Sequence, residues 1–282
     1  MLYNYKLSCY TVPMNERHET VEYKDREFYF LYNERSKAQF TESKRWQEHS
    51  FCEIMYLEEG EIEYAVESKR HVIKKGDVLL VSAGSYHLEK RIIKSPTKLY
   101  CLGFFPDNIG CHDLACEIFE RGRQFSLGKS SAFVMLLSAA REKLSQSKSC
   151  AHEFIRAMSE AAVFILSDLD MSEDPGEDIK NVTVRRVIDY INKNLSEIRS
   201  CEDIAAAMFF SPSYVRSIFK REMGIGIMEY VRNKRILLAH RKMKHGKKPT
   251  EIYAECGFSN YPSFYRAYLD YFGYSPKMVK KL

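Results

Sequence analysis

One helix-turn-helix pattern occurs twice in the last hundred residues, and the two copies are offset by 49 positions. The first copy reads IAAAMFFSPSYVRSIFKREMG and begins at Ile204, and the second reads YAECGFSNYPSFYRAYLDYFG and begins at Tyr253. Two such units held apart by one helix suit two adjacent major grooves of DNA. The expected pairs of equivalent residues are Ala205 with Ala254, Phe209 with Phe258, Val215 with Phe264, Phe219 with Tyr268 and Gly224 with Gly273.

Capping residues mark the helices of both copies. Ser200 precedes the first predicted helix, with Asp203 at its third position as a short capping box. Ser211 and Asn260 are expected to cap the two recognition helices, and a glycine ends each of them. In the second copy, the helix before the turn is predicted to run from Pro249 through Glu255.

Residues 227–243 predict a helix that connects the two copies. Its length of about 26 Å suits two recognition helices held roughly one DNA turn, about 34 Å, apart. The side chains expected to face inward are Tyr230, Ile236, Leu237, Ala239 and Met243.

The two halves of the chain differ in charge. Residues 181–282 contain 19 Lys and Arg but 9 Asp and Glu, whereas residues 1–180 contain 24 and 29. A basic end on an acidic body favours a polyanionic partner for that end alone. The eight cysteines are scattered without a Cys-x-x-Cys pair, which is typical of reduced thiols in a cytoplasmic protein. No apolar run approaches the roughly 20 residues that span a bilayer, so no membrane partner is expected.

Alternating aromatic and β-branched residues predict a β-barrel or sandwich in the first half of the chain. The expected strands are 5–12, 26–32, 51–57, 61–67, 78–82 and 98–105. Helical periodicity then predicts amphipathic helices over 113–121, 131–146 and 151–169. The acidic segment 171–182 contains Pro and Gly and is the predicted linker.

Residues 183–282 resemble the AraC/XylS family of bacterial transcription regulators. The resemblance rests on the first copy of the repeat, on KRILLA at 234–239 and on ECGFSNYPSFYRAYLDYFGYSP at 255–276. The recognition-helix faces opposite the buried stripes carry side chains that can reach base edges and phosphates of double-stranded DNA. These candidate DNA-binding residues are Ser213, Arg216, Ser217, Lys220, Tyr261, Ser263 and Arg266.

The second copy departs from the family pattern. Tyr268 and Leu269 stand where the family usually has Phe-Lys, so one phosphate contact is lost. Pro262 lies near the start of the second recognition helix. We therefore expect the first unit to supply most of the charge-driven affinity, and the second to read its groove more through shape and apolar contact.

The segment HSFCEIMYLEEG at 49–60, followed by His87, resembles the cupin barrel that many AraC-family proteins use to bind effectors. In cupin enzymes the matching positions hold a metal through histidine and carboxylate ligands. Here Gln47 stands in place of one histidine, so no metal or other cofactor is assigned. The single tryptophan could stack on a sugar or aromatic ligand, or serve as a partly buried surface anchor. The expected effector-binding residues are Trp46, Gln47, His49, Glu53 and His87.

These features predict an α+β multidomain regulator rather than an enzyme. The predicted domains are a cupin-like effector-binding and dimerisation domain over 1–170 (barrel about 1–110, helices about 111–170), a linker over 171–182, and an all-α DNA-binding domain over 183–282 with units at about 201–224 and 249–273.

The expected function is sequence-specific transcription regulation under a small-molecule effector such as a carbohydrate or related metabolite, with RNA polymerase as a further partner. The helices over 131–146 and 151–169 either pack against the barrel or pair between two chains, and a homodimer is expected. Two alternatives stay open: a ligand-independent dimeric regulator, and a cupin metalloenzyme with a DNA-binding tail.

Overall fold

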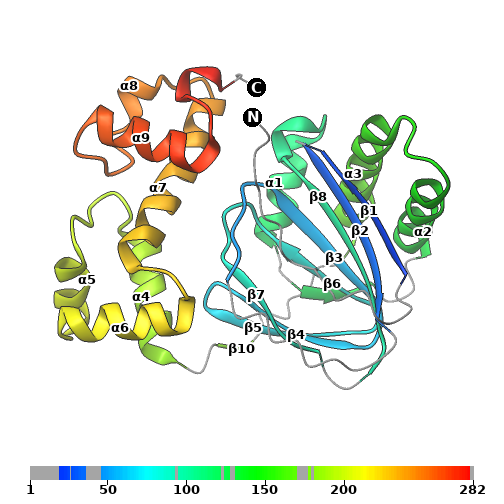
Figure 1. The fold of residues 1–282 in the computed structure, drawn as a ribbon, viewed down its shortest axis with the longest axis horizontal. Helices are drawn as coiled ribbons and strands as arrows, with labels where there is room; N and C mark the ends of the chain where they lie inside the picture. Colours follow the sequence, from blue (N-terminus) through cyan, green and yellow to red (C-terminus); the bar gives the residue numbers. More distant parts are fainter. Residues whose placement is uncertain are drawn as a thin grey trace. The chain divides into compact units, whose positions relative to one another are not determined.

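The computed structural model describes residues 19–25, 27–35, 46–92, 95–121, 124–127, 131–169, 177–178 and 181–279. These residues form two compact units, which meet in the sequence between Glu177 and Asp178. Figure 1 shows strands and helices in the first unit and helices in the second, which confirms the predicted α+β fold class. The predicted strand 5–12 and most of the predicted linker 171–182 lie outside the described residues.

Two sheets make the barrel of the first unit. The strands are β1 (Thr20–Lys24), β2 (Phe28–Arg35), β3 (Cys52–Glu59), β4 (Glu61–Val66), β5 (Lys69–Lys74), β6 (Asp77–Val81), β7 (His87–Ile92), β8 (Thr97–Phe104), β9 (Gln124–Ser126) and β10 (Glu177–Asp178). The six-stranded sheet has the order β1-β2-β8-β3-β6-β9, and the four-stranded sheet has the order β10-β5-β4-β7. Neighbouring strands from β1 to β9 pair antiparallel.

The correctly predicted strands are those rich in apolar residues. β2, β3, β4, β6 and β8 match predicted strands to within a few residues. β5 (KRHVIK) and β7 (HLEKRI) were not predicted, because their many charged residues hide the alternation of a half-buried strand. The prediction also missed β1 and the three-residue β9.

Helices of the first unit pack on the six-stranded sheet. Phe30 and Tyr100 of the sheet share one buried core with Phe133 and Ile155 of the helices. Packing against the barrel was one of the two predicted arrangements for these helices. Figure 1 shows α2 and α3 beside β1 and β2. The helical elements are η1 (Pro106–Asn108), α1 (His112–Arg121), α2 (Ser131–Gln146) and α3 (Ala151–Ser167).

The described part of the second unit is helical from Val182 onward, and its capping residues are those expected. Ser200 and Asp203 form the predicted capping box. Ser211 accepts a hydrogen bond from Tyr214 N at 3.3 Å, and Asn260 accepts one from Ser263 N at 2.9 Å. The elements are α4 (Val182–Lys193), α5 (Cys201–Met208), α6 (Pro212–Met223), α7 (Ile227–Lys244), α8 (Pro249–Ile252), α9 (Tyr261–Phe272) and η2 (Pro276–Met278).

The offset of 49 holds only for the recognition helices α6 and α9. Both helices end at a glycine with φ of 72°, Gly224 and Gly273. The preceding helices align at an offset of 48 instead, since Ile204 and Ile252 are both fully buried. Ala205 is buried whereas Ala254 is exposed. The expected pairing of Ala205 with Ala254, and of Phe209 with Phe258, is therefore wrong.

The turn of the second unit is one residue longer than that of the first. Phe209 and Gly257 both adopt the left-handed conformation, with φ of 60° and 85°. In each unit the next residue donates its N–H back into the preceding segment, from Phe210 to Ala205 O and from Phe258 to Tyr253 O, both at 3.0 Å. In the first unit only Phe210 lies between the left-handed residue and the cap Ser211. In the second unit Phe258 and Ser259 lie between Gly257 and the cap Asn260. The helix predicted through Glu255 ends at Ile252 and continues as turns.

A buried arginine on α7 connects the two helix-turn-helix units. Arg235 donates from Nε to Leu195 O at 2.8 Å and from Nη2 to Ile198 O. Burial lowers the pKa of its guanidinium. Arg199, from the same loop as these carbonyls, donates to Gly257 O at 3.4 Å in the turn of the second unit. Sequence periodicity did not place Arg235 inside, although the five residues expected to face inward are all buried or half-buried.

We expect Gly257→Ala to destabilise the second unit more than Gly246→Ala. Both glycines have left-handed backbones, with φ of 85° and 82°, so alanine costs about 1–2 kcal/mol at either position. A Cβ at Gly257 would lie 2.6–2.8 Å from the Arg235 guanidinium, whereas one at Gly246 meets nothing within 4 Å. Urea unfolding should show an additional loss of about 1–3 kcal/mol for Gly257→Ala. Equal losses would contradict close packing of Arg235 on this turn.

Candidate functional site

The exposed face of α6 gathers the four candidate DNA-binding residues of the first unit. Val215 and Phe219 are fully buried on one side of this helix, and Ile218 and Met223 lie with them. Side chains three or four positions apart share a helix face, so the remaining positions form one solvent-facing stripe. The exposed residues of this stripe are Ser213, Arg216, Ser217 and Lys220.

Arg216 forms an ion pair with Glu202 on the neighbouring helix α5. The guanidinium donates from Nη2 to Glu202 Oε1, in the first turn of α5. The pKa of Glu202 is lowered by its own backbone N–H, by the Ser200 hydroxyl and by Arg216. Both side chains of the pair stay about half exposed, so the guanidinium can still reach a phosphate or a base edge. The sequence pattern did not single out Glu202, because an acidic residue in a first turn is already explained by the helix dipole.

The corresponding face of α9 is more buried. Arg266 is exposed, but Tyr261 and Ser263 are half-buried. The Tyr261 ring packs on Phe264, with 5.8 Å between ring centroids. Leu269, which replaces a lysine of the family pattern, is 39% exposed. Of the three candidates on α9, only Arg266 combines exposure with positive charge.

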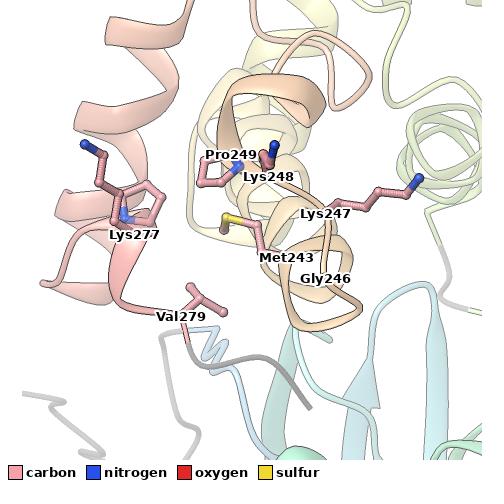
Figure 2. A pocket seen from close by; sticks show the side chains of 8 residues that line it. Met243, Gly246, Lys247, Lys248, Pro249, Lys277 and Val279 are labelled. Carbon is pink, nitrogen blue, oxygen red and sulfur yellow. The ribbon is translucent and has the colours of Figure 1, made fainter.

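A small cavity lies between the end of α7, the start of α8 and η2. Its volume is about 130 Å³, and Met243, Pro249 and Val279 form part of its wall (Figure 2). Figure 2 shows the Lys247 and Lys277 side chains pointing away from it. Pockets for organic ligands usually measure about 300–1,000 Å³. We therefore assign no effector to this cavity.

Three buried side chains converge inside the barrel of the first unit. Glu53 lies on β3 of the six-stranded sheet, His49 precedes that strand, and His87 begins β7 of the other sheet. The Nε2 atoms of His49 and His87 lie 3.2 and 3.7 Å from Glu53 Oε2. Their possible ligand atoms all lie within 4.8 Å of one another. In the part of the chain that the structure describes, no other three His, Cys, Asp or Glu residues gather in this way.

Backbone carbonyls orient both imidazole rings of this cluster. His49 Nδ1 lies 2.9 Å from Phe51 O, and His87 Nδ1 lies 2.9 Å from Ser85 O. A carbonyl oxygen can only accept, so each Nδ1 carries a proton and each Nε2 is directed to Glu53. His87 Nε2 makes no hydrogen bond to any described residue, whereas His49 Nε2 is in close polar contact with the Glu53 carboxylate.

Burial and mutual charge set the ionisation of the cluster. Burial opposes ionisation of Glu53, but the charges of His49 and His87 outweigh it and lower the pKa of Glu53 to about 2. Burial, together with the charge of His49, lowers the pKa of His87 to about 4. Burial also disfavours protonated His49, yet Glu53 raises the pKa of His49. At neutral pH the cluster therefore holds an ionised carboxylate beside a neutral His87.

The donor set fits a divalent transition metal. Imidazole nitrogens and a carboxylate suit zinc, nickel or iron. Metal-ligating histidines usually donate their other ring N–H to a carbonyl or carboxylate, as both rings do here. His49, Glu53 and His87 could thus hold one ion through Nε2 and carboxylate oxygens. The resemblance to the cupin barrel grouped these three residues as one expected site, whereas the carbonyls that orient the rings are set by the folded backbone and could not be predicted.

The other two predicted effector residues lie next to the cluster. Gln47 and His87 exchange backbone hydrogen bonds of 2.8 and 2.9 Å. Trp46 is only 8% exposed. The ring therefore offers little open surface for stacking, and it is more deeply buried than the expected partly buried anchor.

Comparison with known proteins matches both units. Residues 204–281 match a helix-turn-helix domain, and residues 38–103 match a cupin domain. The chain is 30% identical over 99 residues to the probable transcriptional regulator LumQ of Photobacterium leiognathi, which covers 35% of this chain and 40% of that protein. It is 21% identical over 259 residues to the uncharacterized HTH-type transcriptional regulator YdiP of Escherichia coli, covering 87% and 85%. A crystal structure of apo ToxT from Vibrio cholerae aligns with 91% of this chain and 99% of its own, at 11% identity and a TM-score of 0.39.

The chain therefore carries a helix-turn-helix domain of the AraC type over residues 204–281 and a cupin domain over residues 38–103, and its relatives are helix-turn-helix transcriptional regulators. They confirm the prediction of a regulator rather than an enzyme. Among the described residues, no helix has the length and apolar character needed to cross a bilayer.

The two recognition helices carry unequal charge. α6 contains Arg216, Lys220 and Arg221 against the single acid Glu222. On α9 the charges balance, because Arg266 and Asp270 are its only charged residues. Phosphate contacts should therefore concentrate on α6.

We expect Lys220→Ala to reduce the salt dependence of DNA binding more than alanine at Ser263 or Arg266. Each phosphate contact contributes about 0.9 to the slope of log K against log salt concentration. Leu269→Lys, at an exposed position of α9, should increase the slope by a similar amount. Gel-shift titrations at several salt concentrations measure all four variants. A larger loss of slope for Arg266→Ala than for Lys220→Ala would overturn the assignment.

Proposed function

We propose that this regulator binds specific DNA sequences by placing α6 and α9 in two adjacent major grooves. The observation that carries the proposal is the shared design of the two helices, each with one face buried in its own unit and the other in solvent. Figure 1 shows them at opposite ends of α7. The basic charge of residues 181–282 favours the phosphate backbone as the first point of attraction. Arg216 and Arg266 are the proposed readers of base edges, since arginine pairs bidentately with guanine.

The proposed regulator is a homodimer that assembles through its first unit. Met135 on α2 is 68% exposed and Phe164 on α3 is 55% exposed, and both are apolar. A second copy could cover them, and a dimer would double the number of grooves read. RNA polymerase is the further partner through which bound protein would change transcription.

The proposed effector site is the buried cluster of His49, Glu53 and His87. An effector that binds one conformation of the barrel more tightly shifts the population towards it. Through that shift the effector would alter how two copies sit on DNA. A carbohydrate or related metabolite is the effector class expected from the sequence.

We expect Arg216→Ala to weaken binding to a preferred DNA site by about 1–3 kcal/mol and to relax base preference at one position. Sites selected from a random pool supply the DNA, and gel-shift titration with single-base variants of the best site supplies the measurement. Arg156→Ala, an exposed arginine on α3 of the first unit, is the control and should leave affinity unchanged. Unchanged affinity and base preference for Arg216→Ala would refute its role.

A divalent transition metal is the second candidate effector. Three donor atoms within 4.8 Å, on fully buried side chains, match a single ion more closely than the many hydroxyls of a sugar. His87 Nε2 lacks a hydrogen bond within the described residues, and His49 Nε2 contacts only the Glu53 carboxylate there, so an ion between the three groups could bind both nitrogens. Binding would join both sheets, because Glu53 and His87 lie on different ones.

We expect chelator-treated full-length protein to bind one Ni²⁺ or Zn²⁺ per chain in calorimetric titration. Ion at 100 times its Kd should stabilise the fold by about 2.7 kcal/mol and raise the melting temperature. His87→Gln should abolish the shift, because it removes a ligand nitrogen. Glu59→Gln, on the same strand as Glu53 but solvent-exposed, should keep it.

Two other outcomes would decide against the metal. If carbohydrates raise the melting temperature and metal ions do not, the site binds an organic effector rather than a metal. No shift with either class would favour a ligand-independent dimeric regulator.

A further inference from the structure

A cysteine, a histidine and an aspartate lie in successive contact in the first unit, on α1 and the preceding η1. His112 and Cys116 are one helical turn apart on α1, with 3.6 Å between His112 Nε2 and Cys116 Sγ. Asp107, in the preceding η1, places Oδ1 3.2 Å from His112 Nδ1. These residues take no part in either proposed site.

The order of the three groups is that of an activated nucleophile. Asp107 makes a charge contact with Nδ1 that does not have the geometry of a hydrogen bond, and its negative charge favours the tautomer in which Nδ1 carries the proton and Nε2 accepts one. Nε2 then faces the thiol, and transfer of the thiol proton leaves a thiolate paired with an imidazolium. The side chains of His112 and Asp107 are 20% and 15% exposed, so the imidazole is held in a partly desolvated position.

The other described cysteines lack this arrangement in the structure. Cys52 is buried, and burial raises the pKa of its thiol to about 12. Burial also raises the pKa of Cys111. Cys150 is exposed, but its thiol lies 3.8 Å from the Ser149 hydroxyl rather than beside a base. Cys116 combines a base with partial exposure.

We propose that Cys116 is a nucleophilic thiol at which α,β-unsaturated carbonyl compounds form covalent adducts. The Cys116 proton moves to His112 Nε2, and the thiolate sulfur forms a bond to the β-carbon of the compound. The electron pair of the carbon–carbon double bond moves towards the carbonyl, and the α-carbon then takes up a proton. The net change is addition of S–H across the double bond, with no oxidant and no leaving group.

An adduct fits the surroundings better than a disulfide. Burial raises the pKa of Cys52 to about 12 and keeps this thiol protonated, and Cys52 shares a buried core with Ala115 and Ile118 of α1. A protonated, buried thiol is a poor partner for thiol exchange. Cys52 also begins β3, directly before Glu53. An adduct on Cys116 would therefore add volume beside the strand that carries the proposed effector site.

The test is the rate of alkylation at individual cysteines of the reduced, full-length protein. N-ethylmaleimide is the probe, and peptide mass spectrometry gives the rate at each thiol. An ordinary thiol with a pKa of about 8.5 is only about 3% thiolate at pH 7. We expect Cys116 to react about tenfold faster than the more exposed Cys150 at pH 7. Between pH 6.5 and 8.5 its rate should stay nearly flat while that of Cys150 rises steeply.

Substitutions separate activation from mere accessibility. His112→Gln should lower the Cys116 rate to that of Cys150 or below, and Asp107→Asn should lower it several-fold. Glu117→Gln, on the same helix, is the control and should change neither rate. The unsubstituted protein alone can overturn the proposal. It would do so if Cys116 were alkylated more slowly than Cys150 and if the two alkylation rates rose equally steeply with pH. An unchanged rate in folded His112→Gln would also overturn it.

Discussion

The alternation of side chains along each element determines which chemistry reaches solvent and which reaches the interior. On β3 successive residues point to opposite faces, so Cys52 joins the core that contains Ile118 of α1 while Glu53 enters the histidine cluster. On α6 the helical period buries Val215 and leaves Arg216 exposed. In both cases the burial of an apolar neighbour orients the functional side chain. The sites therefore depend on the packing of residues that touch no ligand.

Sequence patterns predicted those features that neighbours along the chain decide. Ser211 and Asn260 cap the recognition helices because each side chain bonds an N–H three residues ahead. The strands rich in apolar residues were predicted correctly because their alternation is visible along the chain. β5 and β7 were not predicted, because their lysines and arginines interrupt that alternation. The extra residue in the second turn was missed, since an aromatic residue, Phe209, takes the left-handed position that Gly257 takes in the other unit.

Contacts between segments distant in sequence could not be predicted in this way. Arg235 lies in a helix with many basic residues, and only the carbonyls of Leu195 and Ile198 explain why it is buried. The spacing of His49 and Glu53 was visible, but the approach of His87 depends on pairing of distant strands. Asp107, His112 and Cys116 are close in sequence, yet their alignment requires the precise start of α1.

The connection through Arg235 has a mechanical consequence. α7 has 18 residues and is about 27 Å long. Arg199 and Arg235 tie the loop before α5 to α7 and to the turn before α9, so the spacer between the recognition helices resists stretching. A duplex whose groove spacing differs from that of the two recognition helices would have to bend to contact both of them. Base steps that bend easily would then be selected between the contacted positions, at base pairs that no side chain touches.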